Sequence, residues 1–497
     1  MRQISIGATG SNRCVRLGGN SARVLTVAFP IGLMLGYAQI AAAASDLQSE
    51  PQFIATQDVS LQPGPGLPPS VGAARSTGNA RGTLAEPVPA VPAAGPAPYS
   101  EAYWGAFADA DLNTLRTAAR TDPEARFAGA MALLAGGYFG DAERALLDVS
   151  QQVAEINVAV ASRIMLASTL RYEHKWSQLR DLPLTAPDNT ITSELEQWGK
   201  AFASTPQEVI HFPGHEVTLP LRLTTIGTPT VRVRINGKDY DFWIDTGSTM
   251  TVISSEVAEA TKSAVLSSDT LSVKTFSGSA PVRATTIKSL EIGSIVISNT
   301  PAVIIDASLM YLRTSAAGDP PSGIAVDGII GWDTIRHFDL TMDYRDGKIT
   351  LKEPIFRGDA VGSERNLVWL ARPLIEVRTK DGGKFHFALD TGAQASFLNA
   401  TVLAKTGTLT RSSAARVHGL AHTGKETTRV VPILALTLAG RTIPLENVIV
   451  YGPVESGLIN CDGILGSDVA QFGAIHIDAT NGVFSVALSD DAEDSAE

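Results

Sequence analysis

Two aspartates in this sequence are well placed for chemistry, because they occupy the same position in two similar stretches. Residues 242–254 read FWIDTGSTMTVIS, and residues 387–399 read FALDTGAQASFLN. In each stretch an apolar strand runs directly into Asp-Thr-Gly, which places Asp245 and Asp390 on a glycine turn at the end of a buried strand. Burying a carboxylate is costly, so a carboxylate in such a place is usually functional. We therefore take both aspartates as candidate catalytic residues.

The two stretches belong to a longer internal repeat. Upstream of each aspartate, an alternating strand, a tight turn and a second strand follow one another in residues 230–247 and 374–392. Downstream, Asp-Gly-apolar-apolar-Gly occurs at 327–331 and again at 462–466, and a hairpin follows each copy at the same spacing. Four features in the same order twice argue against the alternative that each triplet is a surface Asx turn.

On these residues the sequence resembles the aspartic proteases of the pepsin and retroviral protease superfamily. Their pattern is apolar-apolar-Asp-Thr-Gly-Ser/Ala with a later apolar-apolar-Gly, and it covers roughly residues 216–488. The resemblance implies a mainly β fold with two tandem retropepsin-like closed β lobes. These lobes would form a pepsin-like bilobal pseudo-dimer in which Asp245 faces Asp390.

The resemblance further implies that the two carboxyls act as one dyad. Two carboxyls about 3 Å apart cannot both ionise, so they share one proton. The ionised member would take a proton from a water that attacks the peptide carbonyl, and the protonated member would donate to the carbonyl oxygen. We expect no metal and no other cofactor, and a polypeptide substrate bound in extended form.

The neighbours of the dyad receive roles by the same analogy. Thr246 and Thr391 would hydrogen-bond to the backbone of the opposite loop. Gly247 and Gly392 would let backbone N–H groups approach the carboxylates. The glycines expected on the strand that crosses behind each loop are Gly331 and Gly466.

One difference between the repeats concerns acidity. Ser248 offers a hydroxyl near Asp245, whereas Ala393 offers none near Asp390. A hydrogen-bond donor to a carboxylate favours its charged form. We therefore expect Asp245 to be the more acidic partner, and activity to be highest between strongly acidic and neutral pH.

Two glycine-bearing hairpins could close over the substrate, at residues 273–283 and 417–425. Neither contains the Tyr that pepsin-like enzymes carry in this position. The candidate flap residues are Phe276, Gly278, His418 and Gly419.

The N-terminus has the features of an export signal. Four arginines precede an apolar run over residues 24–44, which ends in four alanines. This arrangement predicts a secretory signal peptide over residues 1–44 and a periplasmic or secreted protein. The alternative is an inner-membrane anchor formed by residues 24–44, which are long enough to span a bilayer.

The rest of the chain divides by composition and periodicity. Residues 45–98 are rich in Pro, Ala and Gly and predict a disordered linker. Apolar spacings of three and four predict a small α-helical domain over residues 99–205, with a weak similarity to tetratricopeptide hairpins. This domain could be a support for the protease, a pro-segment or a module that binds a protein partner. A period of two then predicts the lobes at 206–357 and 365–488, followed by an acidic disordered tail at 489–497.

Charge, cysteine content and histidine placement argue against a nucleic-acid partner, an internal disulfide and a metal site. A net charge of −11 and a pI near 5.3 argue against nucleic acid as a partner. Cys14 lies in the predicted signal peptide, so Cys461 is left without a disulfide partner and is expected to be a small buried residue. The histidine pairs at 211/215 and 418/422 lie in strand-like sequence, and we expect no metal site there.

We therefore predict an exported aspartic endopeptidase that is a monomer with an intramolecular pseudo-dimer. The alternative is a catalytically weak or inactive binding protein with a protease fold, in which the helical segment recruits a partner. Retention of both Asp-Thr-Gly triplets favours the enzyme, because a binding module gains nothing from two facing carboxylates.

Overall fold

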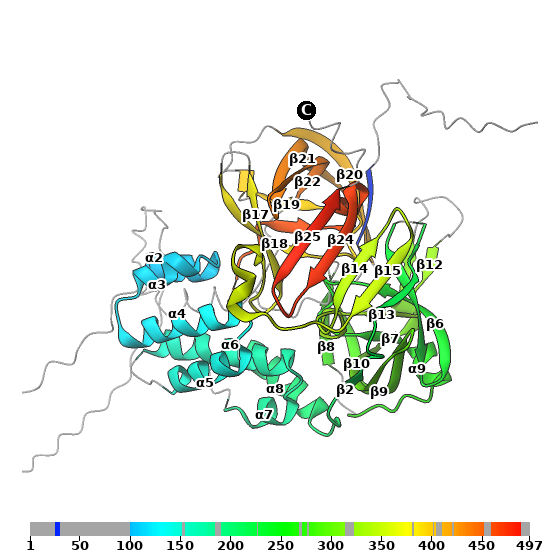
Figure 1. Cartoon of the computed structure of the whole chain (residues 1–497), viewed down its shortest axis with the longest axis horizontal. Helices are drawn as coiled ribbons and strands as arrows, with labels where there is room; N and C mark the ends of the chain where they lie inside the picture. The colour runs from blue at the N-terminus through cyan, green and yellow to red at the C-terminus, as the bar shows by residue number, and fades with distance from the viewer. Residues whose placement is uncertain are drawn as a thin grey trace, which may run out of the picture.

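A helical domain packs beside two β lobes in a computed structural model of the chain (Figure 1). Within the described residues, no helix combines the length and hydropathy of a membrane span. The predicted linker, the acidic tail and most of the predicted signal peptide lie outside these residues. The structure describes residues 25–29, 100–151, 155–183, 190–225, 227–267, 271–275, 278–313, 323–379, 382–400, 402–403, 410–419, 422–451 and 459–488.

The helical domain begins with short, well-capped helices. Thr121 and Glu124 form a capping box at the start of α4, and Gly137, with φ 79°, allows the sharp turn into α5. Helix α6 is buried on most of its faces, so it forms the centre of the domain. The helices are α2 (Glu101–Ala108), α3 (Leu112–Ala118), α4 (Asp122–Ala135), α5 (Phe139–Ser150), α6 (Ile156–Tyr172), α7 (Trp176–Asp181) and α8 (Thr190–Phe202).

The N-terminal lobe is built on a closed β barrel. Its elements are β2 (Val209–His211), β4 (Arg222–Leu223), β5 (Pro229–Ile235), β6 (Lys238–Ile244), β7 (Val252–Ser254), α9 (Ser255–Ala260), β8 (Leu271–Thr275), β9 (Gly278–Ile292), β10 (Ile295–Ile305), η1 (Ala307–Leu309), β11 (Tyr311–Arg313), β12 (Gly323–Ala325), β13 (Gly328–Ile330) and α10 (Trp332–Ile335). The barrel closes in the order β5, β6, β13, β7, β10 and β9, with β9 paired back to β5. Asn236 and Gly237, both at positive φ, make the tight turn between β5 and β6.

The C-terminal lobe repeats this order. Its elements are η2 (Gly358–Glu364), β16 (Leu367–Trp369), β17 (Pro373–Thr379), β18 (Lys384–Leu389), β19 (Phe397–Asn399), β20 (Arg411–Gly419), β21 (His422–Leu438), β22 (Arg441–Tyr451), β23 (Gly463–Leu465) and η3 (Ser467–Phe472). The barrel closes in the order β17, β18, β23, β19, β22 and β21, with β21 paired back to β17. Strand β1 (Leu25–Phe29) pairs in parallel with β20.

One further sheet joins the two lobes. Its strands, in order, are β25 (Val483–Leu488), β24 (Gly473–Asp478), β14 (Asp339–Asp343), β15 (Lys348–Lys352) and β3 (Val217–Pro220). The central pair, β14 with β24, crosses from one lobe to the other and sets Leu340 opposite Ile477 and Met342 opposite Ile475. All four side chains are buried, so the lobes share one apolar core.

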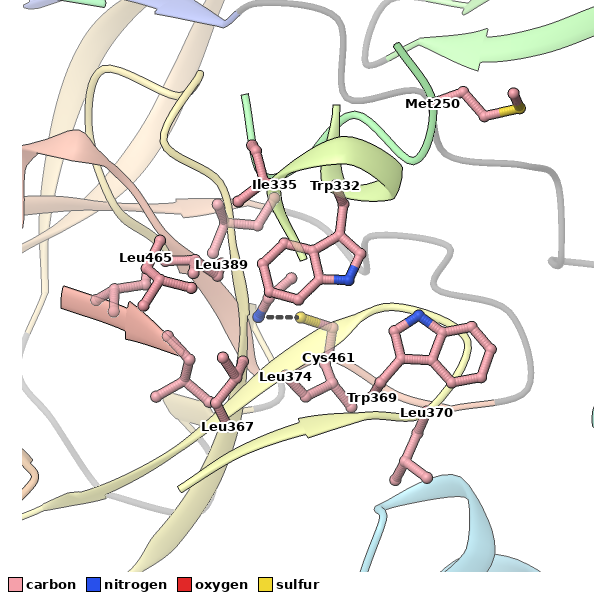
Figure 2. Close-up of a cluster of buried hydrophobic side chains, with 14 of the residues drawn as sticks. Met250, Trp332, Ile335, Leu367, Trp369, Leu370, Leu374, Leu389, Cys461 and Leu465 are labelled. Atoms are coloured by element: carbon pink, nitrogen blue, oxygen red, sulfur yellow. Dashed lines mark hydrogen bonds between the residues drawn. The ribbon is translucent and has the colours of Figure 1, made fainter. Parts of the chain in front are cut away.

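Figure 2 shows a part of this core. Trp332 and Ile335 of α10 pack in the same buried cluster as leucines of the C-terminal lobe. Cys461 lies in this cluster and is buried, as expected, and its Sγ accepts a hydrogen bond from the Ala388 N–H at 3.2 Å. The prediction of a mainly β fold with two tandem closed lobes, preceded by helices, is confirmed.

Candidate active site

Asp245 and Asp390 lie at equivalent ends of equivalent strands. Asp245 directly follows β6, and its N–H donates to the Ile330 carbonyl of β13 at 3.1 Å. Asp390 directly follows β18, and its N–H donates to the Leu465 carbonyl of β23 at 3.0 Å. The backbone of each aspartate is therefore held by a short neighbouring strand, β13 in the first lobe and β23 in the second.

The two loops face each other closely. A Cβ added to Gly247 would lie only 2.4 Å from Cγ of Asp390, so the Asp390 carboxyl rests directly against the first loop. Any side chain at position 247 would collide with it, which explains the glycine. Oδ1 of Asp245 accepts hydrogen bonds from the N–H groups of Gly247 and Ser248, at 2.9 and 3.0 Å.

The second loop holds its carboxyl in the same way. Oδ1 of Asp390 accepts from the Ala393 N–H at 2.9 Å, and the Gly392 N–H contributes a second hydrogen bond that lowers the pKa of Asp390. Backbone donors thus hold both carboxyl groups, and each carboxyl also interacts with the other through its side chain.

The threonines of the two triplets lock the loops together. The Thr246 N–H donates to Oγ1 of Thr391 at 3.1 Å, and the Thr391 N–H donates to Oγ1 of Thr246 at 2.9 Å. Oγ1 of Thr391 in turn donates to the Ile244 carbonyl at 2.8 Å. Both threonines are buried, so these reciprocal bonds are shielded from water and set the spacing of the dyad.

Burial raises the pKa of both catalytic candidates. Asp245 has no exposed surface and Asp390 is 4% exposed. Loss of solvation raises the pKa of Asp390 to about 6, against the opposing effect of its backbone hydrogen bonds. Loss of solvation, followed by the charge of Asp390, raises the pKa of Asp245 well above its ordinary value. The two carboxyls therefore share one proton and titrate as a pair.

The contact on which the Ser248 expectation rested is not made. The Ser248 hydroxyl donates to the Met250 carbonyl at 2.7 Å, inside its own loop, and not to Asp245. The expectation of a more acidic Asp245 therefore loses its physical basis, because a serine hydroxyl takes whichever acceptor its rotamer meets. The difference between Ser248 and Ala393 therefore does not set the acidity of the dyad.

A second pair of aspartates supports the loops, and the sequence analysis assigned neither a role. Asp333 is buried and Asp468 is half-buried. Oδ2 of Asp333 accepts from the Thr251 N–H at 3.0 Å, and its Oδ1 accepts from Oγ1 of Thr251 at 2.9 Å. In the other lobe, Asp468 accepts from the N–H and hydroxyl of Ser396, at 2.8 and 2.6 Å. Their signal in the sequence was the same place in both copies of the repeat, two residues after the glycine of the crossing strand.

The hydroxyls held by these aspartates also fix the crossing strands. The Gly331 N–H donates to Oγ1 of Thr251 at 3.3 Å, and the Gly466 N–H donates to Oγ of Ser396 at 2.9 Å. A Cβ on Gly331 would lie 2.4 Å from the Met250 backbone, so the crossing strand touches the back of the catalytic loop. Asp333 and Asp468 thus each hold a hydroxyl that connects the catalytic loop of its lobe to the crossing strand.

Both expected flap segments form hairpins. Strands β8 and β9 pair up to Thr275 opposite Gly278, so Gly278 begins the returning strand. In the C-terminal lobe, His418 and Gly419 are the last residues of β20 and pair with β21. Phe276 lies outside the described residues.

Comparisons with known proteins give a family and two structural likenesses. A family model described as aspartyl protease matches residues 231–334 and 375–469. No curated protein matches the chain. An aspartic proteinase from Irpex lacteus is similar at 15% identity and a TM-score of 0.37, over 56% of this chain and 98% of its own. A retropepsin-like aspartic protease from Rickettsia conorii is similar at 14% identity and a TM-score of 0.19, over 29% of this chain and 91% of its own.

Proposed function

Since its two β lobes belong to the aspartic protease superfamily, we propose that this protein is an aspartic endopeptidase whose catalytic residues are Asp245 and Asp390. The observation that carries the proposal is the meeting of the two buried carboxyls, with Asp390 against Gly247 and the threonines crossed between the loops. Two facing buried carboxyls are costly to the fold, and shared-proton chemistry gives them a use.

The reaction needs one ionised and one protonated carboxyl, and the proposal gives the ionised role to Asp390. Ionised Asp390 takes a proton from a water, and the oxygen of that water forms a bond to the peptide carbonyl carbon. Protonated Asp245 donates its proton to the carbonyl oxygen, which gives a neutral tetrahedral diol. Asp390 then passes its proton to the amide nitrogen while Asp245 recovers one from a diol hydroxyl, and the C–N bond breaks. Both carboxyls return to their starting states, with one water consumed.

The substrate is proposed to be a polypeptide in extended form. The hairpins β8–β9 and β20–β21 each belong to a lobe whose catalytic loop supplies one aspartate. A peptide that lies between such hairpins and the loops can pair with strand edges through its backbone, and this binding mode reads few side chains. Unfolded segments are therefore the expected targets.

The test is cleavage of a denatured protein mixture by purified residues 45–497, from about pH 3 to about pH 8, with and without pepstatin. Asp245→Asn and Asp390→Asn should each abolish cleavage, because either variant leaves only one titratable member of the dyad. Asp239→Asn is the matched control, since Asp239 is an exposed residue of the same lobe. A wild type that is inert at every pH, or an Asn variant with full activity, would favour the binding protein over the enzyme.

Export is a further part of the proposal. The N-terminal arginines and apolar run support a signal peptide cleaved after Ala44. N-terminal sequencing of the mature protein from a bacterial host should begin at Ser45. A mature chain that retains residues 24–44 and stays with the membrane fraction would instead support the anchor.

A further inference from the structure

The helical domain contacts the loop that carries the first aspartate. Arg171 is the second-last residue of α6 and is 8% exposed. Its Nη2 donates a hydrogen bond to Oγ1 of Thr249 at 3.1 Å. Thr249 lies four residues after Asp245, so a side chain from outside the two lobes bonds to the catalytic loop itself. Because the arginine is buried, water competes little for this bond.

Thr249 lies between two residues that determine how the loop holds Asp245. Before it, the Ser248 N–H donates to Oδ1 of Asp245 at 3.0 Å. After it, the Met250 carbonyl accepts a hydrogen bond from the Ser248 hydroxyl at 2.7 Å. Ser248 and Thr249 share a planar peptide bond, so a displacement of Thr249 also moves the groups that orient the Asp245 carboxyl.

The second catalytic loop is held differently at the equivalent point. In the first loop, the Trp332 N–H donates to the Ser248 carbonyl at 2.7 Å. In the second, the Ser467 N–H donates to the equivalent Ala393 carbonyl at 2.8 Å, and the Ser467 hydroxyl adds another bond to this carbonyl at 3.0 Å. A tryptophan has no hydroxyl to offer. In the first loop, a further side-chain donor comes instead from α6, as Arg171.

The end of α6 is fixed to both lobes, which suits it to hold a loop in place. Cζ of Arg336, in the N-terminal lobe, lies 4.3 Å from the centre of the Tyr172 ring. The centre of the Tyr172 ring also lies 4.3 Å from that of Trp369, in the C-terminal lobe. Cζ of Arg171 itself lies 4.9 Å from the centre of the Trp198 ring, in α8. The arginine therefore reaches the catalytic loop from a fixed support.

We propose that Arg171 is a positioning residue of the enzyme, and that the helical domain is a permanent support of the Asp245 loop. The catalytic part of this role rests on the proposed function, although support of the loop does not need catalysis. Arg171 acts on the dyad through Thr249 and Ser248 and takes no part in the chemistry. Among the roles open to the helical domain, this one is the support, and it is incompatible with a pro-segment that is removed on activation.

The first test removes the bond from either side. Thr249→Val removes the acceptor with little change of shape, and Arg171→Met removes the donor but keeps an apolar stem. Each should lower kcat for a cleavable peptide by about 10-fold to 100-fold and change KM by less than about 3-fold, because a displaced catalytic group slows the chemistry more than it weakens binding. The double variant should be no slower than either single variant, since both remove the same bond. Thr249→Ser keeps the hydroxyl and should keep most of the rate.

A pH profile distinguishes positioning from a smaller fraction of folded enzyme. The Ser248 N–H favours the ionised form of Asp245, and Asp390 is the titratable group that faces this carboxyl. If the loop relaxes and this donor is lost, Asp245 keeps its proton to higher pH, and the alkaline fall of kcat/KM should move up by about 0.5 pH unit in Thr249→Val. Circular dichroism checks that the variant stays folded over the same pH range. A lower rate with an unmoved profile would indicate a merely structural residue and overturn the proposal.

Hydrogen exchange measures the support of the loop without any catalysis. In Arg171→Met, the backbone N–H groups of residues 245–251 should exchange about 10-fold faster than in the wild type, while those of residues 390–396 should be unchanged. Ser467→Ala should give the reverse pattern, because it removes the hydroxyl donor of the second loop. Each loop thereby serves as the internal control for the other.

Arg163→Met is the matched control, since Arg163 lies on the same helix and donates to the Ser150 carbonyl at 2.8 Å. It should leave the rate and both loops unchanged. Unchanged exchange of the first loop in Arg171→Met would overturn the support, and equally faster exchange of both loops would show a general loss of stability and overturn it as well. If the wild type cleaves nothing at any pH while only the first loop loosens in Arg171→Met, the support stands and the proposed enzyme fails.

Discussion

The position of one proton decides the chemistry at the scale of single residues. The two buried carboxyls share it, and burial is the main cause of the raised pKa of each. The Ser248 hydroxyl is engaged by Met250, so the serine that distinguishes the two loops does not donate its hydroxyl to the dyad. Two measurable consequences follow from the raised pKa values.

The first concerns the pH dependence of activity. Because Asp390 must be ionised and its pKa is about 6, we expect kcat/KM to rise as pH increases through about 6. It should fall again only at higher pH, when Asp245 loses its proton. The measurement is a pH profile of kcat/KM on one cleavable peptide. A maximum near pH 3, as in strongly acidic enzymes, would contradict the raised pKa of Asp390.

The second concerns stability. A carboxyl whose folded-state pKa is raised stabilises the protein below its unfolded pKa, and that stability is lost as pH rises through the folded pKa. Asp245→Asn removes the group whose ionisation causes this loss of stability. The side-chain oxygen of the Asn can still accept hydrogen bonds from the N–H groups of Gly247 and Ser248. We expect at least about 1 kcal/mol of added stability at pH 8, or about 2 to 4 °C in Tm, and little change at pH 4. The control is Asp239→Asn; equal effects at both pH values would be the contrary result.

At the scale of elements, a buried cluster of one carboxyl group and two histidines joins the end of α6 to the N-terminal lobe. Glu208 lies between α8 and β2, and its Oε2 lies 3.1 Å from Nδ1 of His174 and 3.4 Å from Nε2 of His337. Burial alone would raise the pKa of Glu208, but the two histidines outweigh it and hold the pKa below its ordinary value. His337 lies two residues before β14, a central strand of the lobe-joining sheet. The cluster therefore connects the helical domain to the sheet that holds the two lobes together.

Loss of the Glu208 carboxylate should weaken the contact between the helical domain and the N-terminal lobe. We expect Glu208→Gln to lower the free energy of unfolding by about 1 to 3 kcal/mol at neutral pH, since a buried charge-assisted network loses its anion. Chemical denaturation measures the change, and limited proteolysis after α8 should become faster. The control is Glu216→Gln, which breaks only an exposed pair with Lys352. If both variants were equally stable, the cluster would not be the link described.

The elements also show where sequence reasoning succeeded and where it could not. The strand, turn and strand that deliver each aspartate are local and occur twice, so they carried the resemblance to the aspartic proteases that implied two closed lobes. The cluster of His174, Glu208 and His337 joins residues far apart in sequence, and no spacing reveals such a contact. The hydroxyl of Ser248 had several acceptors within reach, and only the folded loop selects one. The sequence likewise predicted a helical domain but not that Arg171 would meet the catalytic loop.

At the scale of the whole molecule, the lobe-joining sheet makes one chain sufficient for one active site. The pairing of β14 with β24 holds Leu340 and Ile477 opposite each other, so the lobes are associated within a chain. Each catalytic aspartate therefore meets its partner without a second copy.

This arrangement predicts the behaviour of a mixture. Asp245→Asn and Asp390→Asn, mixed in equal amounts, should remain inactive, because every chain still carries one Asn in its own dyad. Sedimentation of the wild type should give a monomer. Activity restored by mixing, or sedimentation as a dimer with half-active single variants, would show that lobes from two chains form the site.

The placement of α6 has a consequence for the direction in which a substrate lies. A cleft with true twofold symmetry presents the same surface to a peptide and to the same peptide turned end for end, so both orientations bind equally. Here the two lobes repeat each other, but the helical domain does not. Arg171 of this domain contacts Thr249 in the loop that follows Asp245, whereas the equivalent residue after Asp390 is Gln394. In the proposed enzyme, the helical domain would thereby give a near-symmetric site a polarity, so that the two N-to-C directions of a bound chain are no longer equivalent.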